Sequence, residues 1–427
     1  MKLRVGSGFL VVAASRLGSI PMEFGLFLNG YIPGPAAHDP ELEHLSLMRQ
    51  IDYGVLADQN NFKYAWLGEH HCLSEYSHMS APEVVMGAIA ARTERIHLAS
   101  GITSLPTTKE HPVRIAERAA MLDHITEGRF EFGTGRGAGS HEVASFNGTL
   151  ITETKAMWNE VVREIPRMWE QKDYVFDGEF FNVPTPHNVL PKPYLQGHPP
   201  IWLACGNPSS FVTAGEMGIG AVAFNFKPIH DMGPLVDTYK DAAADPKEII
   251  GQFQNNNLML TNEVVCLEDR EEARRIATAR GNGYLITLLH LYHDTFPKMG
   301  NGTTWPSPPD MGVPNEEALD TVIRIGGMLC GTPEDVCEQL AEYQRVGADQ
   351  VAFSFPKDGM NHEQALECIE LFGSRVIPEY DADPVHRSTR FRQQAEPKFP
   401  MFAGEVPDFD IEVLPVGRLR RDSSPAH

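Results

Sequence analysis

Short apolar segments alternate with longer amphipathic segments along most of the chain. Apolar runs predict eight buried strands, at residues 22–28, 62–68, 96–101, 129–133, 201–204, 221–225, 256–260 and 351–355. Apolar residues at helical spacing predict helices, at residues 41–60, 81–92, 111–126, 153–171, 208–217, 232–244, 269–282, 333–346 and 362–376. This strand–helix alternation is typical of right-handed βαβ units and therefore of a parallel sheet.

The number of strand–helix units favours a closed barrel. Eight units over residues 22–380 predict an α/β protein with a (β/α)8 TIM barrel, because a doubly wound sheet, the alternative, rarely carries so many. Two stretches without this alternation are interpreted as insertions after strands 4 and 7, at the proline-rich residues 174–199 and at residues 284–314. Residues 1–21 are predicted to be a disordered N-terminal extension, and residues 381–427 a surface-wrapping or disordered tail.

The composition argues against several classes of function. The 427-residue chain carries a net charge of −21, which disfavours a nucleic-acid partner because phosphate binding needs clustered Lys and Arg. No run of about 18 apolar residues occurs, so no membrane span is expected. The six cysteines are scattered without a C-x-x-C pair, which indicates reduced thiols. Together these features predict a soluble cytoplasmic enzyme.

Polar residues gather where the predicted strands end, which is where a barrel of this kind holds its active site. The candidates are Glu69, His70 and His71 after strand two, Ser100 and Gly101 at strand three, Gly135, Arg136 and Gly137 after strand four, and Asn207, Ser209 and Ser210 after strand five. Arg136 offers a guanidinium on a turn of small residues, and Asn207 begins a helix whose N-terminus favours an anion. The two segments predict a phosphate site, with a plain turn and a plain helix cap as the alternatives.

The adjacent histidines do not predict a metal site. Consecutive residues of a strand point to opposite faces, so His70 and His71 cannot both face the barrel lumen. No His-Glu-x-x-His motif and no Gly-x-Ser-x-Gly elbow occur. His70 is the candidate catalytic base, since a neutral imidazole accepts a proton near pH 7, and a structural hydrogen-bonding role is its alternative.

Several motifs resemble those of the bacterial luciferase-like flavin-dependent monooxygenases. They lie at residues 24–28 (FGLFL), 69–71 (EHH), 91–96 (ARTERI), 111–117 (HPVRIAE), 128–133 (GRFEFG) and 331–336 (GTPEDV). The resemblance covers residues 22–380 and implies a barrel that binds reduced FMN, activates O2 and oxygenates a small, apolar organic substrate. It also implies a separate NAD(P)H:flavin reductase as the electron source, and a homo-oligomer.

The resemblance implies roles for individual residues. His70 matches the active-site histidine proposed as a general base, and Arg136 matches the arginine that holds the flavin phosphate. Ser100 and Gly101 match a bulge, often containing a non-prolyl cis peptide, against which the flavin ring packs. The other residues implied to contact the flavin are Gly135, Gly137, Asn207, Ser209 and Ser210. Gly135 stands where the luciferase has a reactive cysteine, so that thiol is absent here.

Two other functions stay open on the same motifs. Related barrels use a deazaflavin coenzyme and transfer hydride without O2, and the motifs do not distinguish the two coenzymes. A non-catalytic flavin-binding protein is the second alternative.

The resemblance also places residues 284–314 at the position of the family's mobile lid, which excludes water from the site.

Overall fold

The computed structural model describes residues 21–32, 38–74, 76–194, 196–224, 227–279, 287, 316–356 and 359–395. The predictions for residues 1–20, for Asn225 and for residues 396–427 fall outside this described part of the chain. The same holds for the insertion at residues 284–314, apart from Thr287.

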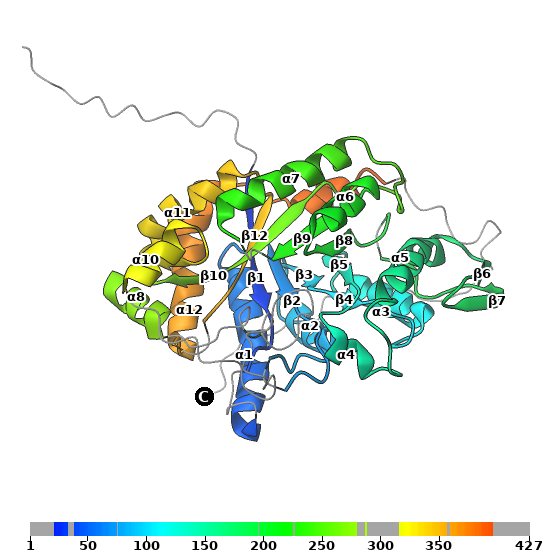
Figure 1. The fold of residues 1–427 in the computed structure, drawn as a ribbon, viewed down its shortest axis with the longest axis horizontal. Coiled ribbons are helices and arrows are strands. Elements are labelled where there is room, and N and C mark those ends of the chain that lie inside the picture. Colours follow the sequence, from blue (N-terminus) through cyan, green and yellow to red (C-terminus); the bar gives the residue numbers. More distant parts are fainter. Residues whose placement is uncertain are drawn as a thin grey trace, which may run out of the picture. The chain divides into compact units, whose positions relative to one another are not determined.

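Eight parallel strands form a closed barrel (Figure 1). In barrel order they are β1 (Glu23–Leu28), β2 (Tyr64–Leu67), β3 (His97–Ser100), β5 (Phe130–Gly135), β8 (Ile201–Cys205), β9 (Gly220–Phe224), β10 (Leu258–Cys266) and β12 (Gln350–Ser354). Pairing of β10 with β9 and of β12 with β1 closes the ring. The predicted (β/α)8 barrel is confirmed, and each of the eight predicted strands coincides with one of these.

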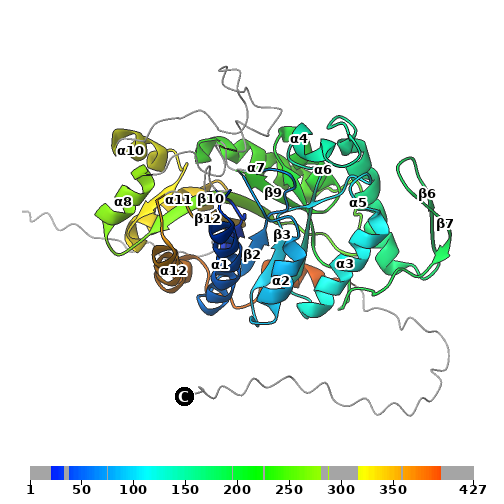
Figure 2. The same ribbon diagram turned by 90° about the horizontal axis from the view of Figure 1, so that it is seen from below.

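Helices cover the outside of the barrel, as Figures 1 and 2 show. They are α1 (Pro40–Gln59), α2 (Pro82–Ala90), α3 (Pro112–Ile125), α5 (Thr154–Glu170), α6 (Pro208–Glu216), α7 (Ile229–Ala244), α8 (Arg270–Ala279), α11 (Pro333–Arg345) and α12 (His362–Leu371). Several begin with proline, whose fixed φ suits the first helical turn and whose missing N–H is not needed there. The π-helix η3 (Phe372–Val376) and the short α13 (Ile377–Tyr380) continue α12.

The structure adds elements that the apolar pattern did not predict. They are β4 (Thr103–Ser104), α4 (Ser140–Ala144), the β6 (Tyr174–Asp177) and β7 (Asn182–His187) hairpin, α10 (Glu316–Arg324), β11 (Leu329–Gly331) and α14 (Arg387–Arg392). The hairpin lies within the proline-rich insertion, beyond α5 (Figure 1). Packing of the Phe176 and Phe181 rings, with centroids 4.7 Å apart, holds it together. The seventh strand is longer than predicted because its second half pairs with β11.

Residues 381–395 cover the N-terminal ends of the barrel strands. Ser388 of α14 hydrogen-bonds the Glu131 carboxylate of β5, and the His386 ring stacks on His97 of β3 with centroids 3.8 Å apart. Glu131 also accepts from the Trp202 indole at 2.8 Å and lies 2.7 Å from Nδ1 of His97. All of these side chains are buried. The opposite end of the barrel is therefore the one left for a site.

The buried groups around Glu131 predict that the free energy of unfolding falls as the pH rises above 6.5. Burial raises the pKa of Glu131 to about 8, and burial lowers the pKa of His97 and His386 well below the ordinary range. The folded protein then keeps a proton on Glu131 that the unfolded chain releases near pH 4.5, so this contribution is lost as the pH rises to about 8. Below pH 6.5 the two histidines, neutral only in the folded state, act in the opposite direction.

Unfolding in urea at several pH values tests this prediction. Between pH 6.5 and 8 the wild-type free energy of unfolding should fall by about 2 kcal/mol, from the upper part of the Glu131 shift alone. Glu131→Gln mimics the protonated acid, so it should fold and show a flatter profile over this range. A variant with the wild-type slope would remove Glu131 as the cause.

Candidate active site

The end of β2 carries the two adjacent histidines, whose side chains make different contacts. The His71 Nε2 atom lies 2.9 Å from Oε1 of Glu69. The His70 ring instead packs edge-to-face on Tyr76, with centroids 4.8 Å apart. The main-chain N–H of His70 donates to the carbonyl of Met79 at 3.0 Å, which fixes the loop after the strand. The two imidazoles therefore do not converge on one point.

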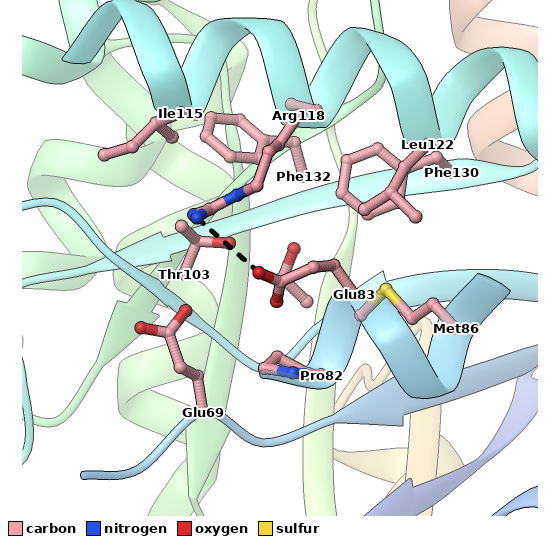
Figure 3. Close-up of a pocket in the computed structure, with 12 residues that line it drawn as sticks. Glu69, Pro82, Glu83, Met86, Thr103, Ile115, Arg118, Leu122, Phe130 and Phe132 are labelled. Carbon is pink, nitrogen blue, oxygen red and sulfur yellow. Dashed lines mark ion pairs between the residues drawn. The ribbon is translucent and has the colours of Figure 1, made fainter. Parts of the chain in front are cut away.

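Glu69 points away from the lumen, into the layer between the barrel wall and helices α2 and α3. It forms a buried ion pair with Lys109. Figure 3 shows its carboxylate facing a small cavity beside the Glu83–Arg118 ion pair. The cavity volume of about 20 Å³ suffices for a single water molecule. Burial, followed by the nearby charge of Arg118, lowers the pKa of Lys109 to about 8.

A carboxylate that the sequence analysis missed lies beside His70. Glu142, on the five-residue helix α4, places Oε1 3.4 Å from Nδ1 of His70. The same oxygen accepts from the main-chain N–H of His71 at 2.9 Å, and Oε2 accepts from that of Ala138 at 2.8 Å. Burial acts to raise the pKa of Glu142, but the charge of His70 and these donors outweigh it, and the pKa lies below its ordinary value. An acidic residue shortly after the glycine-rich turn was the available signal.

The end of β3 carries a glycine that packs against an aromatic side chain. The peptide bond between Gly101 and Ile102 is cis, one residue beyond the Ser100–Gly101 pair. A Cβ at Gly101 would lie 3.0 Å from the Phe27 ring, so the backbone contacts this aromatic side chain directly. The Phe27 ring in turn packs edge-to-face on Phe224, with centroids 5.5 Å apart. This part of the rim is apolar and aromatic.

The ends of β5 and β8 lie side by side, because these strands pair from Phe132–Ile201 to Thr134–Leu203. Arg136 follows β5 and is partly buried, with its guanidinium 3.5 Å from the carbonyl of Ile151. Among the residues that the structure describes, no carboxylate lies within ion-pair distance of it. Gly137, with φ of +94°, turns the chain away from the barrel behind Arg136.

The segment after β8 caps helix α6. The Asn207 side chain accepts from the main-chain N–H of Ser210 at 3.2 Å and from the Ser209 hydroxyl at 2.7 Å. The Ser210 hydroxyl donates to the Asn207 carbonyl at 2.6 Å. This is a capping box, so the plain-cap interpretation holds for these contacts. No described atom lies within 4 Å of the position that a Cβ would take at Gly206, which leaves the backbone there open to a ligand.

The predicted site residues thus all lie at the C-terminal end of the barrel, on the ends of β2, β3, β5 and β8. Within the described ranges, no group of three or more His, Cys, Asp and Glu side chains is arranged to hold a metal ion. None of the described helices has the length and apolar character needed to cross a membrane.

An imidazole–carboxylate pair, an arginine and a capped helix N-terminus lie together at the C-terminal ends of the parallel strands. This arrangement is typical of (β/α)8-barrel enzymes. The family model for luciferase-like monooxygenases matches residues 22–350. The chain belongs to the luciferase-like monooxygenase family, so the predicted family and class of oxidoreductase are confirmed.

Individual relatives are distant but cover most of the chain. The oxygenase component of the flavin-dependent trigonelline monooxygenase of Acinetobacter baylyi is 23% identical over 86% of this chain and 98% of its own. The F420-dependent glucose-6-phosphate dehydrogenase of Kineococcus radiotolerans is 28% identical over 54% of this chain and 66% of its own. The predicted flavin, with a deazaflavin as the alternative, agrees with the coenzymes named among these relatives.

A solved structure supports the fold. The oxygenating constituent of 3,6-diketocamphane monooxygenase from Pseudomonas putida, determined with FMN, superposes with a TM-score of 0.66 at 19% identity. The match covers 84% of this chain and 99% of that one. At this identity the likeness concerns the barrel alone.

Proposed function

We propose that this protein is the oxygenase component of a two-component monooxygenase that uses reduced FMN and O2 to oxygenate a small, apolar organic molecule. The observation that supports it most is the placement of Arg136. It is a partly buried cation without a carboxylate partner among the described residues, and it follows β5, the strand that pairs with the one leading into α6. A phosphate monoester suits this pair of groups, because the guanidinium supplies charge and the helix N-terminus favours an anion. The Ser209 and Ser210 hydroxyls, which donate to Asn207 in this structure, would turn toward the phosphate.

The residues present fit a flavin. Arg136, Asn207, Ser209 and Ser210 would hold its phosphate, next to the open backbone at Gly206. Ser100 and Gly101 would lie against the ring, because a glycine lets a flat group approach the backbone closely, as the Phe27 ring does in this structure. Gly135 and Gly137 keep the turn around Arg136 narrow, because a Cβ at either would press on a neighbouring side chain. When bound, reduced FMN would supply the electrons that activate O2.

The protein's own side chains would bind and orient the substrate and would transfer protons. His70 would accept a proton from the substrate or the flavin at a ring nitrogen. Phe27, Phe224 and Tyr31 would give the substrate an apolar, aromatic surface, which favours a substrate with few charges. A separate NAD(P)H:flavin reductase would deliver the reduced flavin, since the trigonelline relative is named an oxygenase component. A cytoplasmic location would suit such a partner.

Flavin titration followed by coupled turnover tests the proposal. Oxidised and reduced FMN are titrated first, and O2 uptake is then measured with NADH, a flavin reductase and apolar candidate substrates. Substrate-dependent O2 uptake with oxygen in the product supports the proposal. Anaerobic turnover with reduced F420 would replace it by the deazaflavin alternative, and flavin binding without turnover of either kind would leave a flavin-binding protein.

Arg136→Ala should weaken FMN binding by about 10–100-fold, because a charge-assisted contact to phosphate contributes about 1.5–3 kcal/mol. Riboflavin, which lacks the phosphate, is the matched control, and its affinity should change less than twofold or so. Fluorescence titration of both flavins measures the effect. Equal loss for FMN and riboflavin would mean that Arg136 does not contact the phosphate.

A further inference from the structure

Glu142 is held rigidly in front of His70. The residue is 3% exposed, and two main-chain N–H groups, from His71 and Ala138, fix its two oxygens at 2.9 and 2.8 Å. These contacts come from two different segments, the loop after β2 and the turn after β5. The carboxylate therefore cannot move away from His70 without breaking its hydrogen bonds to the main chain of both segments.

In the described part of the chain, the other charged groups near the histidines are paired with one another, Glu69 with Lys109, and both Glu83 and Glu110 with Arg118. Glu69 contacts His71 and the Lys109 ammonium on the outer side of the loop. Tyr76 packs edge-to-face on the His70 ring, and a phenol carries no charge at neutral pH. Of the carboxylates in the described residues, Glu142 is the one whose ion pair with the His70 ring is observed, at Nδ1.

We propose that Glu142 is a positioning residue, which holds His70 with the proton on Nδ1 and so leaves Nε2 as the atom that accepts a proton. The use of that proton acceptor in oxygenation rests on the proposed function. The tautomer itself does not, because it is a property of the protein alone. At 3.4 Å the contact is an ion pair and not a hydrogen bond, and the Nδ1–H tautomer is the one that points a positive edge at the carboxylate. Catalytic contacts commonly tighten when the substrate binds.

The chemistry needs no additional reactant. One edge of a neutral imidazole donates and the other accepts, so a carboxylate at Nδ1 selects the tautomer whose lone pair is on Nε2. When Nε2 takes a proton, the ring becomes a cation and the adjacent Glu142 anion stabilises it. The proton leaves Nε2 again when the substrate or solvent takes it back, and Glu142 stays ionised throughout.

Nitrogen-15 NMR of histidine-labelled, flavin-free protein tests the tautomer directly. In the wild type near neutral pH, the proton of neutral His70 should be on Nδ1. In Glu142→Gln the two tautomers should mix or reverse, whereas Glu142→Asp should retain the Nδ1–H form in part. A wild-type spectrum with the proton on Nε2 would overturn the proposal without any variant.

Turnover gives the second readout. Glu142→Gln should lower kcat about tenfold, because the imidazolium that forms at His70 loses its neighbouring anion. Glu164→Gln removes another buried carboxylate, which contacts Tyr174 on the outside of the barrel, and should leave kcat unchanged. An unchanged kcat in Glu142→Gln would contradict the proposal, while a normal tautomer without oxygenation would overturn only the proposed function.

Discussion

Replacing Arg392 by methionine should lower the free energy of unfolding by about 3–5 kcal/mol, because it leaves a buried carboxylate without its counter-ion. Arg392 of α14 is 3% exposed, and its guanidinium donates to both oxygens of the fully buried Asp123 at 2.7 and 2.8 Å. It also donates to the carbonyl of Gln196 at 3.0 Å. Methionine replaces the apolar stem of the arginine and none of these donors.

Urea unfolding followed by circular dichroism measures the loss. Arg390→Met is the matched control, because Arg390 lies on the same short helix and pairs with Asp383 at an exposed position. Exposed pairs contribute at most about 1 kcal/mol. The double variant Arg392→Met with Asp123→Leu should recover part of the loss, since both charges are then removed together. If Arg392→Met cost no more than Arg390→Met, α14 would contribute little to the stability of the barrel.

The apolar pattern predicts the barrel well and α14 poorly, for a physical reason. Strands such as β2 and β12 are buried on both faces, so their residues form apolar runs that are visible in the sequence. The sequence of α14, RSTRFR, has no apolar face. It is held instead by polar contacts to residues such as Glu131 and Asp123, which lie more than 250 positions away in the chain.

The candidate site likewise contains some residues that the sequence could reveal and others that it could not. His70, Arg136 and Asn207 could be found because each lies within three residues of the end of a strand, and the ends of parallel strands meet on one rim. The position of Glu142 shortly after the glycine-rich turn did not by itself place it beside His70, because that depends on how the loop after Gly137 folds into a five-residue helix. Lys109 was not among the predicted site residues, and its ion pair with Glu69 depends on how the loops after β2 and before α3 fold against each other.

His70→Ala should lower kcat of the reconstituted enzyme by about 10²-fold or more, because general base catalysis typically contributes that much. The affinity for FMN should change little, since the groups proposed to bind its phosphate follow β5 and β8, two and three strands further around the barrel than β2. Single-turnover measurements with pre-reduced flavin separate binding from chemistry.

The same variant distinguishes catalysis from packing. His124→Ala is the control, because this histidine, on α3, hydrogen-bonds the carbonyl of Lys192 away from the strand ends. A structural role for His70 predicts that both variants lose thermal stability while kcat per folded molecule is unchanged. A catalytic role predicts loss of kcat in His70→Ala alone, and this loss should not be increased by adding Glu142→Gln, because Glu142 acts only through the imidazole.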